Sequence, residues 1–340
     1  METKALSGQR VAYLDILRLL ATIGVIFLHV TCEGITENKF TYNWYVDIIF
    51  DGFVRWTVPM FVMISGVIFL NPEKEVTTHS ILTKRVPRLL RTYIFWLILY
   101  PILMIVGGTA MSGGVFTFSY QYLEPHFHLW FLPMLMGVYL VTPFLRIIVN
   151  DERLLRYALI IWFCYIIVSF VLVKDVPQIS PLFAMNTVVG FSGYFLLGFA
   201  LSKQEFTKNN KALIYTLGLI ACVIIVAGNQ AAMRLGGGEM FMSYLSPHVV
   251  MMSSALFVLV RETSRSYEGK MSRILDYTRK DLFGIYLTHA FFIHIMNRPA
   301  FRDVTSHFIT LPVLTIVIFF LSLYTTKILR LIPFMRKVVE

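Results

Sequence analysis

Three ionisable side chains lie within a long apolar segment near the start of the chain. The segment comprises residues 11–31, VAYLDILRLLATIGVIFLHVT, and includes Asp15, Arg18 and His29. A charged group at the centre of a bilayer costs several kcal/mol, so such groups usually pair or serve a function. On a helix, Arg18 and His29 share one face and lie about 16 Å apart along the axis. Asp15 and Thr22 lie near the same face, because each is about one helical turn from Arg18.

These residue types can carry group-transfer chemistry. An imidazole titrates near neutral pH, so His29 can accept a proton from a reacting hydroxyl. Arg18 can bind an anion or stabilise developing negative charge, and Asp15 can hold Arg18 in place. The alternative for Asp15 and Arg18 is an internal ion pair that only stabilises membrane insertion. We take His29, Arg18 and Asp15 as the candidate catalytic residues.

A cluster of arginines precedes the third apolar segment, in the sequence KRVPRLLR at residues 84–91. Arg85, Arg88 and Arg91 follow at steps of three, so neighbouring side chains share a helical face. Guanidiniums at the start of a helix suit phosphate, through paired hydrogen bonds and the helix dipole. Arginines beside a membrane also commonly bind anionic lipid headgroups. The residues alone leave both functions open.

Further polar and aromatic residues are expected to line the outer part of a cavity and to bind a substrate: Arg55, His128, Trp130, Tyr286 and His289. Arg55 can instead pair with Asp47 or with Asp51, which is four residues away. The two histidines of the HFH sequence at residues 126–128 lack a definite third ligand, so no metal site is expected.

Ten apolar segments are long enough to cross a bilayer, which predicts an all-α polytopic membrane protein. They cover residues 11–31, 44–70, 88–110, 129–149, 157–173, 182–201, 211–228, 244–261, 281–297 and 310–330. An even number of segments places both termini on one side. The loops on that side contain 23 lysines and arginines, whereas the opposite loops contain five. Because positive residues favour cytoplasmic loops, both termini are predicted to be cytoplasmic.

The composition agrees with this class. Hydrophobic residues make up 57% of the 340 residues, and no polar stretch is long enough to form a second domain. Residues 1–340 are therefore predicted to form one integral-membrane domain. A net charge of +10 would suggest nucleic-acid binding in a soluble protein. Here the basic residues lie in short loops, so we expect membrane lipids and no nucleic acid as partners.

Several motifs together resemble the acyltransferase family 3 membrane proteins. They are LDILRLLATIGVIFLH at 14–29, VPMFVMISGVIFL at 58–70, the Arg85–Arg88 pair, HLWFLPML at 128–135, YFLLGFAL at 194–201 and FGIYLTHA at 283–290. The first motif separates Arg18 from His29 by ten residues, as in that family's first-helix signature. The sequence looks most like the stand-alone branch that includes bacterial O-acetyltransferases of surface polysaccharides.

The resemblance implies an enzyme of the bacterial inner (plasma) membrane. Such an enzyme would move an acyl group, often acetyl, from cytoplasmic acetyl-coenzyme A to a hydroxyl of a cell-envelope glycan or lipid-linked sugar. It also implies donor-phosphate binding by the arginines at the start of the third segment, namely Arg85, Arg88 and Arg91. His29 would then take the proton of the acceptor hydroxyl as that hydroxyl attacks the thioester.

Two alternatives remain at this level. A secondary transporter or flippase for an amino acid or a lipid-linked glycan would also carry charged residues inside its spans. Acyl transfer could be direct, with His29 as base, or could pass through an acyl-histidine intermediate. The sequence is compatible with a monomer and with a homo-oligomer.

Overall fold

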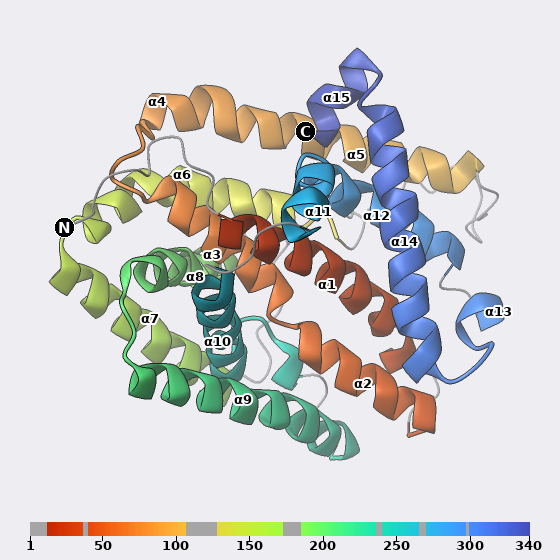
Figure 1. Ribbon diagram of the computed structural model, residues 1–340, viewed down its shortest axis with the longest axis horizontal. Helices are drawn as coiled ribbons and strands as arrows, with labels where there is room; N and C mark the ends of the chain where they lie inside the picture. Colours follow the sequence, from red (N-terminus) through yellow and green to blue (C-terminus); the bar gives the residue numbers. More distant parts are fainter. Residues whose placement is uncertain are drawn as a thin grey trace.

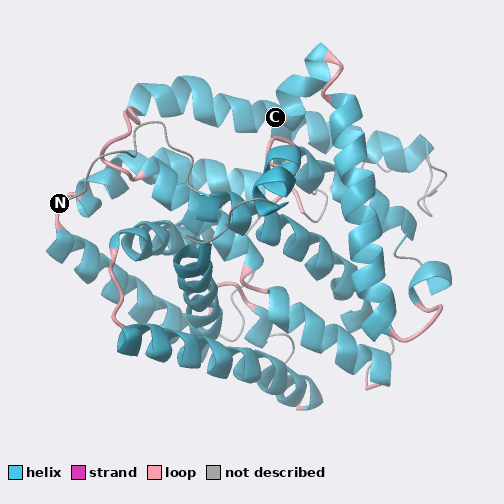
Figure 2. Cartoon of the chain, in the orientation of Figure 1, coloured by secondary structure: helices cyan, strands magenta, loops and turns pink. Residues whose placement is uncertain are grey.

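The computed structural model describes residues 12–36, 40–106, 128–172, 185–235, 240–264, 270–296 and 299–340, and every structural statement below concerns these residues. They form helices joined by turns and short connections, with no strand among them (Figure 2). The predicted all-α fold class is confirmed for this part of the chain.

The long helices follow the predicted apolar segments. They are α1 (Ala12–Thr36), α2 (Tyr42–Val54), α3 (Thr57–Phe69), α5 (Val86–Val106), α6 (Phe131–Val149), α7 (Glu152–Leu172), α8 (Met185–Lys203), α9 (Lys208–Arg234), α10 (Pro247–Thr263), α12 (Leu282–Met296) and α14 (His307–Leu329). The short elements are α4 (Thr78–Ser80), the π-helical turn η1 (Ile81–Arg85), the 3-10 turn η3 (Met240–Met242), α11 (Lys270–Thr278), α13 (Pro299–Arg302) and α15 (Pro333–Val339).

Within the described residues, seven helical spans are long and apolar enough to cross a membrane, and two shorter apolar helices, 187–203 and 282–296, accompany them. The chain is therefore a multi-pass membrane protein. The total of ten spans and the cytoplasmic position of both termini stay predictions, because length and composition do not orient a helix in a bilayer.

Helix α1 lies at the centre of the bundle and packs against α2, α3, α10, α12 and α14 (Figure 1). In the most apolar stretch of α1, 72% of the residues are buried. The corresponding shares for α7 and α9, at the edge of the bundle, are 17% and 22%. Lipid can cover apolar side chains at the edge, but polar side chains on α1 must find their partners within the protein.

The second predicted span is broken in its middle. Helix α2 ends at Val54 and α3 begins at Thr57, with Arg55 and Trp56 in a turn between them. Pro59 explains the position of the break, since its ring would clash with the carbonyl of the residue four positions earlier, which is Arg55. Non-helical backbone at membrane depth is tolerated where protein buries it, and both ends of this break are buried.

Small residues bring the central helices together. A Cβ atom at Gly66 of α3 would collide with the backbone carbonyl of Phe195 on α8. The absence of a side chain at Gly66 thus allows close contact between α3 and α8. At the other end of the bundle, a Cβ atom at Gly34 of α1 would collide with the carboxylate of Asp47 on α2.

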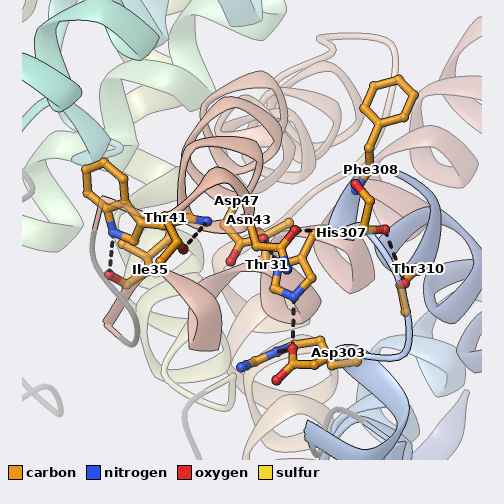
Figure 3. A network of polar contacts seen from close by, with 12 residues as sticks. Thr31, Ile35, Thr41, Asn43, Asp47, Asp303, His307, Phe308 and Thr310 are labelled. Carbon is orange, nitrogen blue, oxygen red and sulfur yellow. Dashed lines mark hydrogen bonds and ion pairs between the residues drawn. The ribbon is translucent and has the colours of Figure 1, made fainter.

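Asp47 belongs to a polar network that ties α2 to the start of α14 (Figure 3). The Nδ1 atom of His307 lies 2.7 Å from Asp47 Oδ1, and its Nε2 atom lies 2.9 Å from Asp303 Oδ1. His307 is buried, and Arg302 Nε donates to Asp303 Oδ1 over 3.1 Å. His307 could not be singled out from the sequence, because one of its carboxylate partners is distant in the chain and the other lies in a turn.

Asp303 provides a test of this network through acid unfolding. Burial alone would raise the pKa of Asp303, but hydrogen bonds from His307 and Arg302 and their positive charges hold that pKa below its ordinary value. A lowered folded-state pKa stabilises the fold above the unfolded value of about 3.9, and this stabilisation is lost as pH falls through the lowered pKa. We expect Asp303→Asn to unfold at lower temperature at pH 7 in detergent and to lose less stability on acidification below about pH 4.

Asp276→Asn is the matched control, since Asp276 is an exposed carboxylate that lies 3.8 Å from Arg279. Equal acid dependence in the wild type and in Asp303→Asn would contradict a stabilising role for the Asp303 carboxylate.

Candidate active site

The polar stripe predicted on α1 is present in the structure. Arg18 Nη1 donates to Asp15 Oδ1 over 2.9 Å, and Thr22 Oγ1 donates to the Arg18 carbonyl over 2.8 Å. The side chain of Arg18 is 35% exposed. Thr22 is buried and His29 is half-buried, so the stripe is accessible near both ends and closed between them.

Three histidines from three parts of the chain gather at one end of this stripe. The ring of His29 on α1 stacks on that of His289 on α12, with centroids 5.4 Å apart and 24° between the ring planes. His128, just before α6, lies perpendicular to His289 with centroids 5.2 Å apart. The structure therefore brings together His29 and two of the residues predicted to line the cavity.

Two tyrosines fix the backbone around this histidine cluster. Tyr286 Oη donates to the carbonyl of His128 over 2.5 Å, and Tyr100 Oη donates to the carbonyl of Leu287 over 2.5 Å. Both tyrosines are buried, and the ring of His128 contacts both of their rings. Tyr286 was predicted as a substrate contact, but its hydroxyl is used to hold His128. Tyr100 was missed because nothing in its local sequence distinguishes it from other aromatic residues.

Arg55, in the turn between α2 and α3, is paired. Its Nε atom donates to Asp51 Oδ2 over 2.5 Å, which selects Asp51 over Asp47 as its partner. The guanidinium also lies over the ring of Tyr244, 5.6 Å from the centroid. Tyr244 in turn stacks on Trp130, with centroids 5.9 Å apart and 25° between the planes. Arg55 and Trp130 thus meet through Tyr244, whose role was missed because its partners lie far from it in sequence.

The predicted basic cluster surrounds a tyrosine on α6. The Tyr139 hydroxyl interacts electrostatically with Arg85, Arg88 and Arg18, which come from the start of the third predicted segment and from α1. Arg85 lies over the Phe69 ring, 5.5 Å from its centroid, and that ring stacks on Tyr139 at 4.5 Å. Arg85 ends the π-helical turn η1, an irregularity that is common at functional sites.

Other arginines in the predicted cytoplasmic loops are used to hold the fold. Arg146 donates to the carbonyls of Phe69, Asn71 and Lys74, and Arg261 donates to those of Leu201 and Gln204. Arg330 pairs with Asp281 and Glu340.

Arg85 and Arg88 make no such hydrogen bonds or ion pairs with the described residues. Within the described part of the chain, neither has a carboxylate oxygen within 4.0 Å, and both are exposed. Their guanidiniums contact aromatic rings, and the positive charge of Arg85 acts on Arg88. Two neighbouring positive charges suit the binding of an anion. Arg91 is exposed, and the structure shows no ion pair or ring contact that joins it to this cluster.

A line of ring contacts along α12 connects the arginines to the histidines. Arg88 lies over Phe283 at 6.0 Å, and Phe283 stacks on Tyr286 at 6.3 Å. Tyr286 contacts His289 at 6.0 Å, and His289 stacks on His29. The three α12 residues follow at steps of three, so each neighbouring pair shares a face. Helices α1 and α12 therefore both extend from the basic cluster to the histidine cluster.

Within the described residues, no three His, Cys, Asp or Glu side chains are arranged so that they could hold a metal ion. The site supplies imidazole, phenol and guanidinium groups. Such groups can accept a proton from a hydroxyl and can bind or stabilise negative charge.

Removing the Tyr286 hydroxyl tests how tightly the histidine cluster is held. Tyr286→Phe leaves the buried His128 carbonyl without this donor, which should cost about 1–3 kcal/mol of stability. Thermal unfolding in detergent measures the loss. Tyr324→Phe is the control, because the side chain of Tyr324 is 54% exposed on α14. Equal unfolding temperatures for both variants would mean that the Tyr286 hydroxyl contributes no net stability.

Comparison with known proteins agrees with the geometry of this site. Neither the curated proteins nor the solved structures contain a match to the chain. The acyltransferase-domain family known as acyltransferase 3, in contrast, matches residues 11–329, nearly the whole chain. This match includes the α1 stripe, the arginines of α5 and the histidine-bearing segment of α12. The chain belongs to the acyltransferase 3 family.

Proposed function

We propose that the protein is a membrane O-acyltransferase that moves an acyl group, acetyl in the simplest case, from cytoplasmic acyl-coenzyme A to a hydroxyl of a cell-envelope glycan or lipid-linked sugar. Family membership supports acyl transfer. The observation that carries the proposal is the line of contacts that joins an uncommitted arginine cluster to a buried histidine cluster.

The arginine cluster is the proposed donor site. Arg85 and Arg88 would bind the phosphates of coenzyme A, because paired guanidinium hydrogen bonds match phosphate oxygens. Arg18 interacts with the same Tyr139 hydroxyl and is half-buried beside Asp15, so it would complete the site. Asp15 then acts by holding Arg18. Arg91 is proposed only as a peripheral contact, since it lies exposed outside the cluster.

The histidine cluster is the proposed reaction centre. His29 would accept the proton of the acceptor hydroxyl while the hydroxyl oxygen attacks the thioester carbonyl. The new C–O bond forms as the C–S bond breaks, and the sulfur leaves with the bonding electrons as the coenzyme A thiolate. The proton held by the imidazole then passes to the thiolate or to water. An acyl-histidine intermediate would require His29 itself to attack the carbonyl.

The proposed acceptor site lies beside the histidines, where Arg55, Trp130 and Tyr244 meet. Asp51 neutralises Arg55, so this region offers hydrogen-bond donors and acceptors without a strong net charge. The stacked Trp130 and Tyr244 rings supply a flat apolar surface. A polyhydroxylated ring with one apolar face matches this combination. We assign the protein to the bacterial inner membrane, where it would meet both donor and acceptor and could form a homo-oligomer.

Donor binding tests the arginine cluster. We expect Arg85→Gln and Arg88→Gln each to raise the KM for acetyl-coenzyme A about tenfold or more, because a hydrogen bond to a charged group contributes about 1.5–3 kcal/mol. Steady-state kinetics and stabilisation of the purified protein by coenzyme A measure the effect. Arg156→Gln removes the same charge from an exposed arginine that pairs only with Glu152, and it should leave KM unchanged. An equal change in all three variants would point to a general electrostatic effect.

Acyl transfer is tested with radiolabelled acetyl-coenzyme A and a cell-envelope fraction. Label should enter the envelope fraction only with the wild-type protein, and His29→Ala should reduce the rate by at least about 100-fold while coenzyme A still stabilises the variant. Undiminished labelling by that variant would contradict the mechanism. A transporter or flippase would instead move an unlabelled acceptor across vesicles without any acyl donor. Label trapped on His29 in the absence of acceptor would favour the acyl-histidine route.

A further inference from the structure

His289 is held so that only one of its ring nitrogens can take up a proton. The Nδ1 atom lies 2.6 Å from the carbonyl oxygen of Tyr286. A carbonyl oxygen only accepts hydrogen bonds, so Nδ1 must carry the hydrogen. In the neutral ring Nε2 is then the proton-accepting nitrogen. A base whose other nitrogen is fixed by a hydrogen bond is the usual arrangement in general base catalysis.

The carbonyl that fixes this tautomer is itself well anchored. The backbone around it is held by the hydrogen bonds that Tyr286 and Tyr100 make to the carbonyls of His128 and Leu287. On the opposite side of α12, a Cβ atom at Gly284 would collide with Thr326 of α14, so the two helices are in close contact. His289 is fully buried, and its ring has little freedom to turn.

The stacking of His289 on His29 disfavours a positive charge on both rings at once. Two positively charged rings with centroids 5.4 Å apart would repel each other, and the repulsion is strong where water is largely excluded. His128, at 5.2 Å from His289, brings a third imidazole to the cluster. A proton taken up by one ring therefore opposes protonation of the other.

We infer that His289 and His29 act as one proton-accepting pair in the proposed transfer, with His289 as the positioning partner of His29. This inference rests on the proposed function. As the acceptor oxygen attacks the thioester and the C–S bond breaks, the hydroxyl proton enters the pair. Neutral His289 fixes the plane of the His29 ring by stacking and leaves the pair able to accept that single proton. The pair then returns the proton to the thiolate or to water.

His289→Asn separates this role from a merely structural one. The asparagine amide nitrogen occupies nearly the position of Nδ1, so it retains the hydrogen bond to the Tyr286 carbonyl, but nothing replaces Nε2 or the stacked ring. We expect kcat for transfer of labelled acetyl to fall about 100-fold, with the KM for acetyl-coenzyme A and stabilisation by coenzyme A unchanged. Retention of most of kcat would show that the hydrogen bond to Tyr286 is all that His289 provides, and would overturn the inference.

The double variant tests whether the two rings form one unit. If they do, His29→Ala with His289→Asn should be about as slow as His29→Ala alone, because residues of one catalytic unit are strongly non-additive. If the fold-reduction in kcat of the double variant equals the product of the two single fold-reductions, the two residues act independently. That result would contradict the pair. His248→Gln is the matched control: His248 is also buried, and its Nε2 lies 2.7 Å from the carbonyl of Phe241. This control should retain the wild-type kcat.

The outcomes also separate this inference from the function on which it rests. If the wild type transfers no acetyl and coenzyme A does not stabilise it, the proposed function fails. If the wild type transfers acetyl and His289→Asn matches it, only the paired role of His289 fails. Unfolding of His289→Asn is detected by its melting temperature, and His289→Gln, which places an amide at the position of Nε2, then replaces it in the kinetic comparison with the same expected loss of kcat.

Discussion

A polar group inside a bilayer finds no water, so its hydrogen bonds must be made within the protein. This constraint explains why α1 lies at the centre of the bundle. Arg18 bonds to Asp15, Thr22 bonds to a backbone carbonyl, and His29 stacks on His289. The bonds of Arg18 and Thr22 are made within α1, but at the lipid-facing edge the Arg18–Asp15 charges would face hydrocarbon, which is costly, and His29 would lose His289. The edge is instead occupied by α7 and α9, whose exposed side chains are mainly apolar.

The same constraint separates two uses of arginine. Arg146 and Arg261 complete the hydrogen bonding of helix ends, and Arg55 is neutralised by Asp51. Each of these guanidiniums is satisfied by the fold. Arg85 and Arg88 are held over aromatic rings, which orient a guanidinium but do not neutralise its charge. This pair of positive charges beside Tyr139 has no ion pair within the described residues, although the charge of Glu340 acts on Arg88, and both side chains are exposed to water or to an anion.

Features that depend on helical spacing could be predicted from the sequence. These include the all-α fold, the common face of Arg18 and His29, and the pairing of Arg18 with Asp15. The steric effect of the Pro59 ring also lies in the local sequence, although residues 44–70 were predicted as one segment. Local spacing also pointed to Asp51, four residues before Arg55, but it cannot identify partners from distant segments, such as Tyr244.

The parts of the site that were missed depend on packing between distant segments. Tyr139, Tyr244 and Tyr100 resemble the other aromatic residues of an apolar chain until their neighbours are known. The role of His307 could be recognised only from the fold, because its partner Asp47 is 260 positions away in the sequence. The polar residues of each helix could thus be predicted from the sequence. Which residues they contact could be known only from the arrangement of all the helices.

The length of the α1 stripe constrains the kind of donor that could use both ends of the site. Arg18 lies with the arginine cluster and His29 with the histidines, and helical geometry separates them by about 16 Å. An acyl phosphate carries its reactive carbonyl directly beside its phosphate, so binding at the arginines would leave that carbonyl far from His29. A donor whose phosphates and thioester are joined by a long, thin arm could occupy both ends at once. From Phe283 to His289, the ring contacts of α12 run in the same direction as the α1 stripe, so aromatic side chains mark the route from the arginines and imidazoles stand at its end.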